Sequence, residues 1–593
     1  MVTGRSGAVA VTGMAWTTPL GDGVDEVWRR LCAGESGITE VASPHKVRTP
    51  LAGVVTPPDY AAADPDERHT ELTVRTVRAA LADAGLAEPT ADLGEELLLV
   101  LGTSLGGQLD SPVEPERHWI RRVADRVGVT RTPVCVTTAC SAGSDSLLLA
   151  QALIRTGRAS VCVAGGADVL SEAKRLGHTA LGTMSPTGLR AFDAGHDGML
   201  LGEGAGFLVL ESAERAAARG ARVHARLVGA GSANDAAGLT APDPSGDSIV
   251  AAVGRSLAAA GLRPEDVSVV CAHATGTAAN DAVEAASLHR VFAAGSADPV
   301  VFGTKGALGH SLGATGAIEG IATILALRDR RVPPIAGLRS PQPGFRLRLA
   351  DSSRQQVDPG AGLSVTLGFG GFNTSLLFAL DEADGHGSAQ SAAAFAPPAA
   401  PPPVVLGHGT RTVADLSTCS ANRPSFYADP LAWLVNAAVE DALEDCRDTL
   451  LADRDQVGVL VLTGDRPLPT AGLIAATVAR GRVSPLRFAG GNPGILAGLS
   501  CIERGFRGPS LVLSAAEDAT VATALALAEA WLQDGRARYV VCARHREEAE
   551  GEAQTVTCVV LRQAAGADEG VSAADPRALL LAPAVNRLPV DEG

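Results

Sequence analysis

Cys140 is the residue whose neighbours most directly suggest covalent chemistry. It stands in the stretch VTTACSAGSDSLLLAQ, residues 136–151, beside residues with almost no side chain, Ala139 and the run 141–143. A structural cysteine is usually buried as a small apolar residue among larger ones, whereas these neighbours leave the sulfur open to approach. The pattern indicates a reactive thiol, although the local sequence alone leaves an inert cysteine as an equal alternative.

The residues around Cys140 predict a strand over 132–139, a helix over 140–157 and another strand over 160–166. Cys140 would then be the residue at which a strand ends and a helix begins. The helix dipole and the free backbone N–H groups at a helix N-terminus favour an anion. We therefore expect the pKa of this thiol to be lowered toward the thiolate.

A second predicted helix start carries a histidine in the equivalent position. His310-Ser-x-Gly313 aligns with Cys140-Ser-x-Gly143, and a strand-like run precedes each of them. This repetition predicts that the first 380 residues are two copies of one α/β half. A twofold arrangement would bring the two helix starts face to face and create a site.

Two further stretches add polar side chains to this candidate site. VSVVCAHATGTAANDAVEAASL, residues 267–288, has a strand-like run ending at His273, a Thr/Gly loop and an acidic helix. Lys305 lies in the apolar, Gly-rich stretch GTKGALGH and is one of only three lysines in the chain, with Lys46 and Lys174. A structural histidine and a solvated lysine remain the simpler interpretations of each residue taken alone.

Together these stretches resemble the β-ketoacyl synthases, the decarboxylating condensing enzymes of fatty-acid and polyketide synthesis. The order and spacing of the motifs fit that family from about residue 8 to residue 380. The resemblance implies an α/β thiolase fold, two fused halves in five layers (α-β-α-β-α), which is normally dimeric. The matching motifs are TACSA around Cys140, FDAGHDGMLLGEGAG at 192–206, TAPDP at 240–244, HATGT at 273–277, KGALGHSLGA at 305–314 and TLGFGGFNTS at 366–375.

The resemblance also implies the catalytic roles. Cys140 would attack an acyl thioester and hold the chain as a covalent intermediate. The backbone N–H groups of Cys140 and Phe369 would form an oxyanion hole. His273 and His310, both neutral, would donate to the thioester carbonyl of a malonyl unit as it loses CO2 and becomes an enolate. Lys305, with Glu319 as its partner, would orient the site and help to keep His310 neutral.

Several supporting roles follow from the same resemblance. Thr275 and Thr277 match positions that hydrogen-bond a pantetheine arm, and Thr240 is a further candidate. Asp281 and Glu284 match a supporting acidic pair. Phe369 matches a gate that moves when acyl and malonyl substrates exchange, a motion that the glycines around it would permit. No cofactor and no metal is implied, because the substrates arrive on the phosphopantetheine arm of a separate acyl carrier protein.

The sequence departs from the family pattern in two places. His196 stands where arginine is usual in FDxxRDG. The segment from Gly102 to Cys140 is shorter than the resemblance leads us to expect, and this segment normally shapes the dimer interface and the acyl tunnel. Chain-length specificity is therefore not carried over.

Residues 403–565 resemble a truncated, degenerate third copy of the first half. VVLGHGT (404–410) parallels VAVTGMA (9–15), and residues 508–543 parallel the unit around Cys140. In that parallel Ala516 replaces the cysteine and is followed by Glu517 and Asp518, so we expect a non-catalytic domain. The predicted organisation is a ketosynthase domain over 1–382, a Pro/Ala-rich linker over 383–402, this degenerate domain over 403–565 and a flexible tail over 566–593.

Composition limits the partners and the compartment. The net charge of −16 argues against nucleic acid, and the apolar runs are too short or broken to span a membrane. Ten scattered cysteines without a CxxC pair suggest neither zinc nor disulfides. We see no signal peptide pattern and expect a cytoplasmic protein.

The expected partners are an acyl carrier protein and a second subunit, which would be a homodimer partner or a ketosynthase-like or chain-length-factor subunit. An acidic carrier must dock on a local basic patch. The arginines of ERHWIRRVADRVGVTR, residues 116–131, are the candidate, with a solvated helix face as the alternative.

Three functions stay open from the sequence. The first is a discrete elongating ketosynthase with a degenerate companion domain. The second is a chain-length-factor or scaffold subunit, against which the intact Cys140, His273, His310 and Lys305 count. The third is a condensing-fold acyltransferase that transfers acyl groups without decarboxylation.

Overall fold

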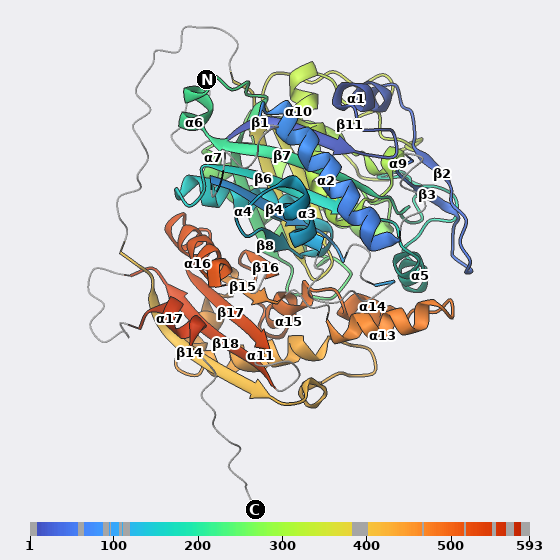
Figure 1. Ribbon diagram of the computed structural model, residues 1–593. Helices are drawn as coiled ribbons and strands as arrows, with labels where there is room; N and C mark the ends of the chain where they lie inside the picture. Colours follow the sequence, from blue (N-terminus) through green and yellow to red (C-terminus); the bar gives the residue numbers. More distant parts are fainter. Residues whose placement is uncertain are drawn as a thin grey trace, which may run out of the picture.

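Two α/β regions follow each other along the chain, residues 9–381 and residues 401–564, and they occupy the upper and lower parts of Figure 1. The structure is a computed structural model. It describes residues 9–56, 64–86, 94, 96–105, 109–110, 119–293, 295–381, 401–464, 468–514, 518–547, 553–564 and 574–582.

The first half of the upper region contains five strands in the order β5-β4-β6-β7-β1. β4 is parallel to β5 and β6, whereas β7 is antiparallel to β6 and to β1. Strand β4, with the sequence LLLVLG, is apolar throughout, as expected for a strand covered on both faces. The bounds are β1 Val9–Thr17, β4 Leu97–Gly102, β5 Val134–Val136, β6 Val161–Asp168 and β7 Gly204–Ser212.

The second half repeats this topology in the order β10-β9-β12-β13-β8. β9 is parallel to β10 and β12, and β13 is antiparallel to β12 and β8. The predicted repetition of one half is therefore confirmed. The bounds are β8 Ala225–Asn234, β9 Val267–Cys271, β10 Val300–Phe302, β12 Ala361–Gly368 and β13 Phe372–Ala379, with β11 Arg348–Leu349 beside β10.

Helices complete five layers around these strands. α2 covers the outer face of the first half, α4 and α10 lie between the halves, and α7, with α8 beside it, covers the outer face of the second half. α4 and α10 are buried along almost their whole length, which explains their nearly continuous apolar sequences. The layer order α-β-α-β-α is the one that the resemblance implied. The bounds are α2 Pro65–Asp83, α3 Trp119–Val127, α4 Ala142–Arg155, α7 Asp247–Ala260, α8 Ala278–Phe292 and α10 Thr315–Asp329.

Shorter elements connect the layers. Strands β2 and β3 pair in a separate two-stranded sheet. Helix α5 begins at a serine, Ser171, whose side chain accepts a hydrogen bond from the Lys174 N–H and so caps the helix. The bounds are α1 Val24–Cys32, β2 Ile38–Glu40, β3 Leu51–Gly53, α5 Glu172–Leu181, α6 Ala213–Ala218 and α9 Lys305–Leu308.

The lower region has the same strand order and directions for a third time, β16-β15-β17-β18-β14. α11 and α15 pack on one face of these strands and α16 packs on the other. The bounds are β14 Val404–Val413, α11 Pro430–Ala442, α12 Arg447–Ala452, β15 Val457–Thr463, α13 Pro469–Val478, α14 Pro485–Gly490, α15 Ile495–Arg504, β16 Ser510–Ser514, α16 Asp518–Gln533, β17 Tyr539–Glu547, β18 Gln554–Arg562 and α17 Pro576–Leu581.

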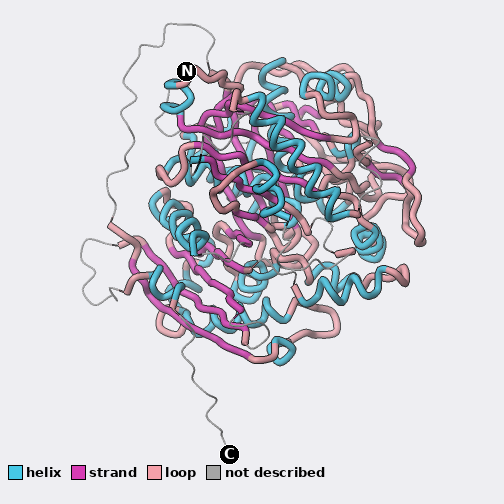
Figure 2. The backbone as a smooth tube through the Cα atoms, in the orientation of Figure 1, coloured by secondary structure: helices cyan, strands magenta, loops and turns pink. Residues whose placement is uncertain are grey.

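The two regions are joined through their sheets. β5 pairs antiparallel with β16, so that Val136 lies opposite Leu513. β1 and β8 also pair, and all three sets of strands therefore form one continuous 16-stranded sheet, the magenta strands of Figure 2. α16 packs against α4, and its Trp531 is fully buried in the same apolar core as Leu147.

The structure corrects several predicted boundaries. The strand predicted over 132–139 is only Val134–Val136, and the helix predicted from 140 begins at Ala142. The predicted tail is wrong for Pro576–Leu581, which form α17 because Leu580 is buried against the lower region. Ala516, Glu517 and nearly all of the predicted linker lie outside the described residues.

Within the described residues, no helix combines the length and the apolar character needed to cross a membrane.

Truncation after residue 382 should expose the β5 edge and the apolar surface that α16 covers. A strand edge that has lost its partner and a large apolar surface seldom stay exposed in a monomer. The truncated protein should aggregate or change its oligomeric state, which light scattering measures against the full chain.

A point substitution tests the same junction in the intact chain. Leu513→Ala, at a fully buried position of β16, should lower the free energy of unfolding by about 2–5 kcal/mol. Leu380→Ala, at a position that is 38% exposed, should change it by less than about 0.5 kcal/mol. Equal effects of the two substitutions, or an unchanged truncated protein, would contradict a shared core.

Candidate active site

Cys140 lies in a single 3-10 turn, Ala139–Ser141, between β5 and α4. Ala139 has φ 54°, a left-handed conformation that costs free energy in a residue with a side chain. Ala274 and Leu312, beside His273 and His310, have φ values of 48° and 50°. Backbone strain thus lies within two residues of Cys140, His273 and His310, three of the four residues that the sequence singled out for chemistry.

The small residues beside Cys140 also allow close packing. A side chain on Gly143 would come within 2.9 Å of the Gly313 carbonyl oxygen, and one on Gly316 within 2.0 Å of Ser144 Oγ. The starts of α4 and α10 therefore lie face to face, as predicted. Cys140 itself is only 6% exposed, so the expectation of an uncovered sulfur is wrong for this conformation.

The pKa of the Cys140 thiol differs from the sequence-based expectation. Burial raises this pKa to about 12, because a thiolate would lose its hydration. The positive charge of Lys305 and the backbone N–H groups of Phe369 and Cys140 lower the pKa, but burial outweighs them. The resting side chain is therefore a neutral thiol, and the two N–H groups at the sulfur are placed to stabilise developing negative charge.

His273 and His310 meet edge to face, with ring centroids 5.2 Å apart. The Leu312 N–H donates to His310 Nδ1 at 3.1 Å, so the proton of the neutral ring is on Nε2, which can donate to a substrate. Burial, followed by the charge of Lys305, lowers the pKa of both histidines well below the usual value. Both rings are therefore neutral at physiological pH.

Lys305 is the first residue of α9 and is 1% exposed. Its Nζ donates to Glu319 Oε1 at 2.7 Å and also to the carbonyl oxygen of His273. Thr304 Oγ1 donates to the same Glu319 oxygen at 3.1 Å. The cation is thus held between α10 and the end of β9, and its charge lowers the pKa of Cys140, His273 and His310 alike.

The predicted acidic pair on α8 holds the loop that carries His273. Glu284 accepts hydrogen bonds from the N–H groups of His273 at 2.6 Å and Ala274 at 2.8 Å. Burial raises the pKa of Glu284 to about 7. Asp281 accepts from the Gly276 N–H at 3.1 Å, so both carboxyl groups support the backbone of this loop.

Asp281 also explains the histidine at position 196. His196 Nδ1 lies 3.0 Å from Asp281 Oδ2, so the two side chains form an ion pair when the imidazole ring is protonated. The hydrogen bond to Asp281 raises the pKa of His196. The histidine therefore provides a polar contact to the acidic pair at the position where the family pattern has arginine.

The remaining predicted residues are three threonines and Phe369. Thr275 Oγ1 and Thr277 Oγ1 are 3.0 Å apart. Phe369 is half-buried and precedes Gly370 and Gly371, whose φ values of 87° and 83° favour glycine. The Gly370 N–H donates to the Leu239 carbonyl oxygen, which brings the segment containing Thr240 to this turn.

A small cavity beside Cys140 is lined partly by residues that the sequence did not identify as part of the site. Its free volume is about 20 Å³, room for about one water molecule. His178 lies between two aromatic rings, 5.8 Å from that of Phe369 and 5.1 Å from that of Phe488. Phe488 and Asn492 belong to the lower region. No sequence signal connects them to Cys140, and the cavity can admit a larger molecule only when these side chains move.

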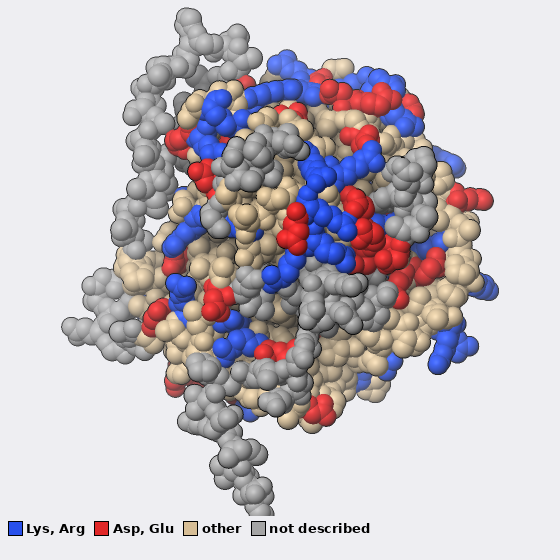
Figure 3. All heavy atoms as spheres, viewed as in Figure 1, with Lys and Arg blue, Asp and Glu red and all other residues tan. Residues whose placement is uncertain are grey.

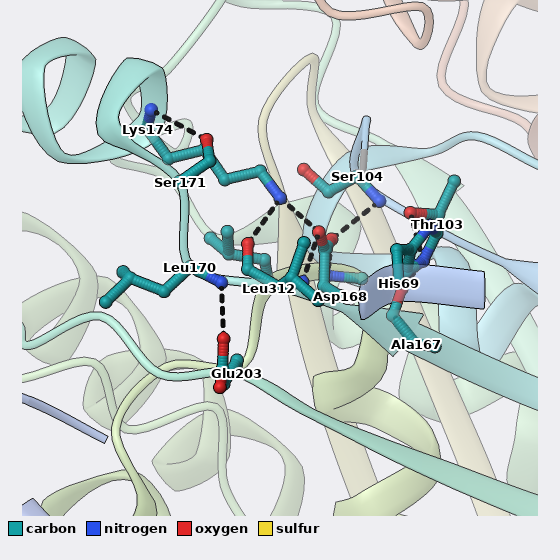
Figure 4. Close-up of polar contacts among 12 residues, drawn as sticks. His69, Thr103, Ser104, Ala167, Asp168, Leu170, Ser171, Lys174, Glu203 and Leu312 are labelled. Carbon is teal, nitrogen blue, oxygen red and sulfur yellow. Dashed lines mark hydrogen bonds and ion pairs between the residues drawn. The ribbon is translucent and has the colours of Figure 1, made fainter. Parts of the chain in front are cut away.

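Lys174 also lines this cavity and forms a buried ion pair with Asp168 (Figure 4). It is one of only three lysines in the chain, which is the only feature of the sequence that pointed to it. Asp168 Oδ2 accepts hydrogen bonds from the N–H groups of Ser104 at 2.8 Å and Gly313 at 3.0 Å. Asp168 therefore connects the end of β6 to the loop after β4 and to the turn that begins α10. This network positions the segments around Cys140.

Comparison with known proteins identifies the family. The model of the β-ketoacyl synthase N-terminal domain matches residues 6–216, and that of the C-terminal domain matches residues 224–339. The 3-oxoacyl-[acyl-carrier-protein] synthase 2 of Vibrio harveyi is 32% identical over 409 aligned residues, which cover 62% of this chain and 98% of the relative. The chain belongs to the β-ketoacyl synthase family.

Solved structures of β-ketoacyl synthases extend this likeness. The ishigamide ketosynthase/chain length factor has a TM-score of 0.58 at 30% identity and covers 64% of this chain and 100% of its own. The PfaC keto synthase-chain length factor has a TM-score of 0.74 and covers 94% of this chain and 78% of its own. At 17% identity the second match shows a shared fold alone, and its coverage includes most of the lower region.

The lowered pKa of His310 predicts a pH dependence of stability. Below about pH 6.5 the unfolded chain binds a proton at this residue that the folded state excludes, so the free energy of unfolding falls as the pH falls, by about 1.4 kcal/mol per pH unit for each such group. His310→Gln should remove this share of the slope between about pH 6.5 and pH 5.

Urea unfolding of both proteins at several pH values measures the difference. His408→Gln, at an exposed histidine of β14, is the matched control and should leave the slope unchanged. A slope equal in the wild type and in the His310 variant would contradict a neutral, buried ring.

Proposed function

We propose that this β-ketoacyl synthase is an elongating ketosynthase that joins an acyl chain on Cys140 to a malonyl unit with loss of CO2. The observation that carries the proposal is the buried Lys305 cation. Its Nζ donates to the His273 carbonyl oxygen, and its charge acts to lower the pKa of Cys140 and of both histidines. The substrates would arrive on an acyl carrier protein, which is the substrate carrier given in the name of the Vibrio harveyi relative.

The first step transfers the chain to the enzyme. Cys140 Sγ forms a bond to the thioester carbonyl carbon, and the bond from that carbon to the pantetheine sulfur breaks. The thiol proton leaves with the pantetheine sulfur, so the carrier departs as a thiol. The N–H groups of Cys140 and Phe369 stabilise the oxyanion of the tetrahedral intermediate, and one well-placed donor is worth about 3–4 kcal/mol.

The second step uses the two neutral histidines. A malonyl thioester loses CO2, and the electron pair of the broken C–C bond becomes an enolate whose oxygen accepts hydrogen bonds from His273 and His310. Neutral donors suit this step because the charge develops during the reaction. The enolate carbon then attacks the acyl carbonyl, the bond to Cys140 Sγ breaks, and the released thiolate takes a proton from water.

The lower region would be the degenerate companion domain, residues 403–565, beside a catalytic domain over 1–382. Its strand order matches that of the first half, and its β16 occupies the edge of β5. We infer that it takes the place of half of a dimer partner and that its role is structural. Through Phe488 and Asn492 it would also shape the acyl cavity.

Substitution of the three reactive residues separates the two steps. Cys140→Ala should abolish condensation because no other group receives the acyl chain. His273→Ala and His310→Ala should each slow malonyl decarboxylation by about 10²–10³-fold, the loss of one oxyanion donor, while acyl transfer to Cys140 partly survives.

Release of labelled CO2 from malonyl carrier protein and mass spectrometry of acylated Cys140 measure these effects. Acyl transfer without CO2 release in the wild type would favour the acyltransferase function, and the absence of both would favour a scaffold. Near-normal decarboxylation in both histidine variants would refute the assigned roles.

Phe488→Ala should enlarge the cavity and shift the products toward longer chains. Gly177 packs so closely on the Phe488 ring that an added side chain would come within 2.4 Å of it, so this ring fills the available space. Leu380→Ala, at an exposed position far along the chain from this helix, is the control. An unchanged distribution of chain lengths, measured by mass spectrometry, would remove Phe488 from the acyl cavity.

A further inference from the structure

The arginines that the sequence proposed for carrier docking are occupied by other contacts. Arg122 pairs with Asp66, and Arg126 pairs with Glu67 and Glu71. Arg131 donates to a backbone carbonyl, and Arg117 lies outside the described residues. Figure 3 shows blue and red spheres mixed over this face near α2 and α3. The charges of Arg122 and Arg126 are therefore already balanced by neighbouring carboxylates.

A different set of basic residues is exposed without carboxylate partners. None of these basic residues forms an ion pair in the described part of the chain. They lie on two segments, around residue 46 and around residue 482, that are far apart in sequence but adjacent in the structure. A side chain on Gly481 would lie 2.9 Å from His45 Nδ1. We call this surface the α13–α14 patch; its basic residues are Lys46, Arg48, Arg480, Arg482 and Arg487.

The α13–α14 patch also presents apolar side chains. Only three large apolar residues of the described chain are exposed, and two of them lie here, Leu473 at 46% and Leu486 at 36%. Exposed apolar groups beside unpaired cations are typical of a surface that binds a partner. Blue spheres at the right-hand edge of Figure 3 lie near the tip of α13, the orange helix in Figure 1.

The position of the patch connects it to the active site. α13 and α14 pack on α5 in one apolar cluster with Leu105, Leu109 and Phe488, three residues that also line the Cys140 cavity. Arg487 is adjacent to Phe488 in the chain. On the other segment, the Arg48 N–H donates to Thr179 Oγ1 at the end of α5. The patch is therefore the outer surface of one wall of the cavity.

We propose that the α13–α14 patch is the docking surface for the acidic acyl carrier protein. This inference rests on the proposed function, because it assigns the partner of the same site. The net charge of −16 repels an acidic protein at long range, so docking requires a local positive surface. Unpaired cations would attract the carboxylates of the carrier, and the two leucines would contact its apolar side chains. The surface combines residues of both regions, so the catalytic domain alone would present only part of it.

Charge reversal tests the surface. Arg482→Glu/Arg487→Glu should raise both the Kd and the KM for a malonyl-loaded acyl carrier protein about tenfold, with kcat unchanged, and should weaken their dependence on salt. The kinetic constants for a malonyl thioester of free pantetheine should not change, because this substrate does not need the surface.

Arg346→Glu/Arg454→Glu is the matched control with the same change in net charge. Both arginines are exposed and form no ion pair in the described chain, and Arg454 lies at the end of β15 opposite to α13. This variant should keep the Kd within about twofold. Equal losses in the two variants would overturn the proposal, because they would show an effect of overall charge.

The Kd distinguishes this proposal from the proposed function. A wild type that binds the carrier through this patch but releases no CO2 from either malonyl substrate would refute the condensing activity and retain the docking surface. Unchanged carrier binding in Arg482→Glu/Arg487→Glu would refute the docking surface whatever the activity.

Discussion

One buried cation organises the chemistry of this protein. Lys305 contacts the carboxylate of Glu319 and the carbonyl oxygen of His273, and none of these groups reaches bulk water. Removing an ammonium group from water is costly unless a charge and hydrogen bonds replace the lost hydration. The arrangement of α9, α10 and the end of β9 satisfies this requirement. Burial keeps both imidazoles neutral, and the fixed positive charge adds to this effect and favours negative charge at the sulfur of Cys140.

The neutrality of the histidines and the high pKa of the thiol have the same origin. A site closed to water makes every charged state costly, so each group rests in its uncharged form. The backbone N–H groups at Cys140 and the donor at His310 Nε2 then remain available for charge that appears only during a reaction. This separation of a neutral resting state from a charged transition state is the condition for electrostatic catalysis.

The site is closed to water because helices α4 and α10 approach each other closely. The repeated strand order of the two halves brings these helices together. Two halves of equal topology place equivalent helix starts together, with Gly143, Gly313 and Gly316 at the contact. The lower region, which has the same strand order, extends the sheet through β5 and β16 and adds Phe488 to the cavity wall. The lower region thus contributes to the site by packing, although its own counterpart of the cysteine position lies outside the described residues.

Sequence motifs alone determined the family and the repeat of two halves, and they singled out Cys140, His273, His310 and Lys305 as candidate site residues, because each depends on local patterns of residue type. The pKa of Cys140 could not be predicted in this way. The helix start favours an anion, but burial by residues distant in the chain reverses the sign. Only the tertiary structure could place Phe488 beside Cys140, or His45 beside Gly481, since no pattern within either segment encodes the contact. Both contacts join residues of the upper and lower regions, so they exist only when the two regions pack together.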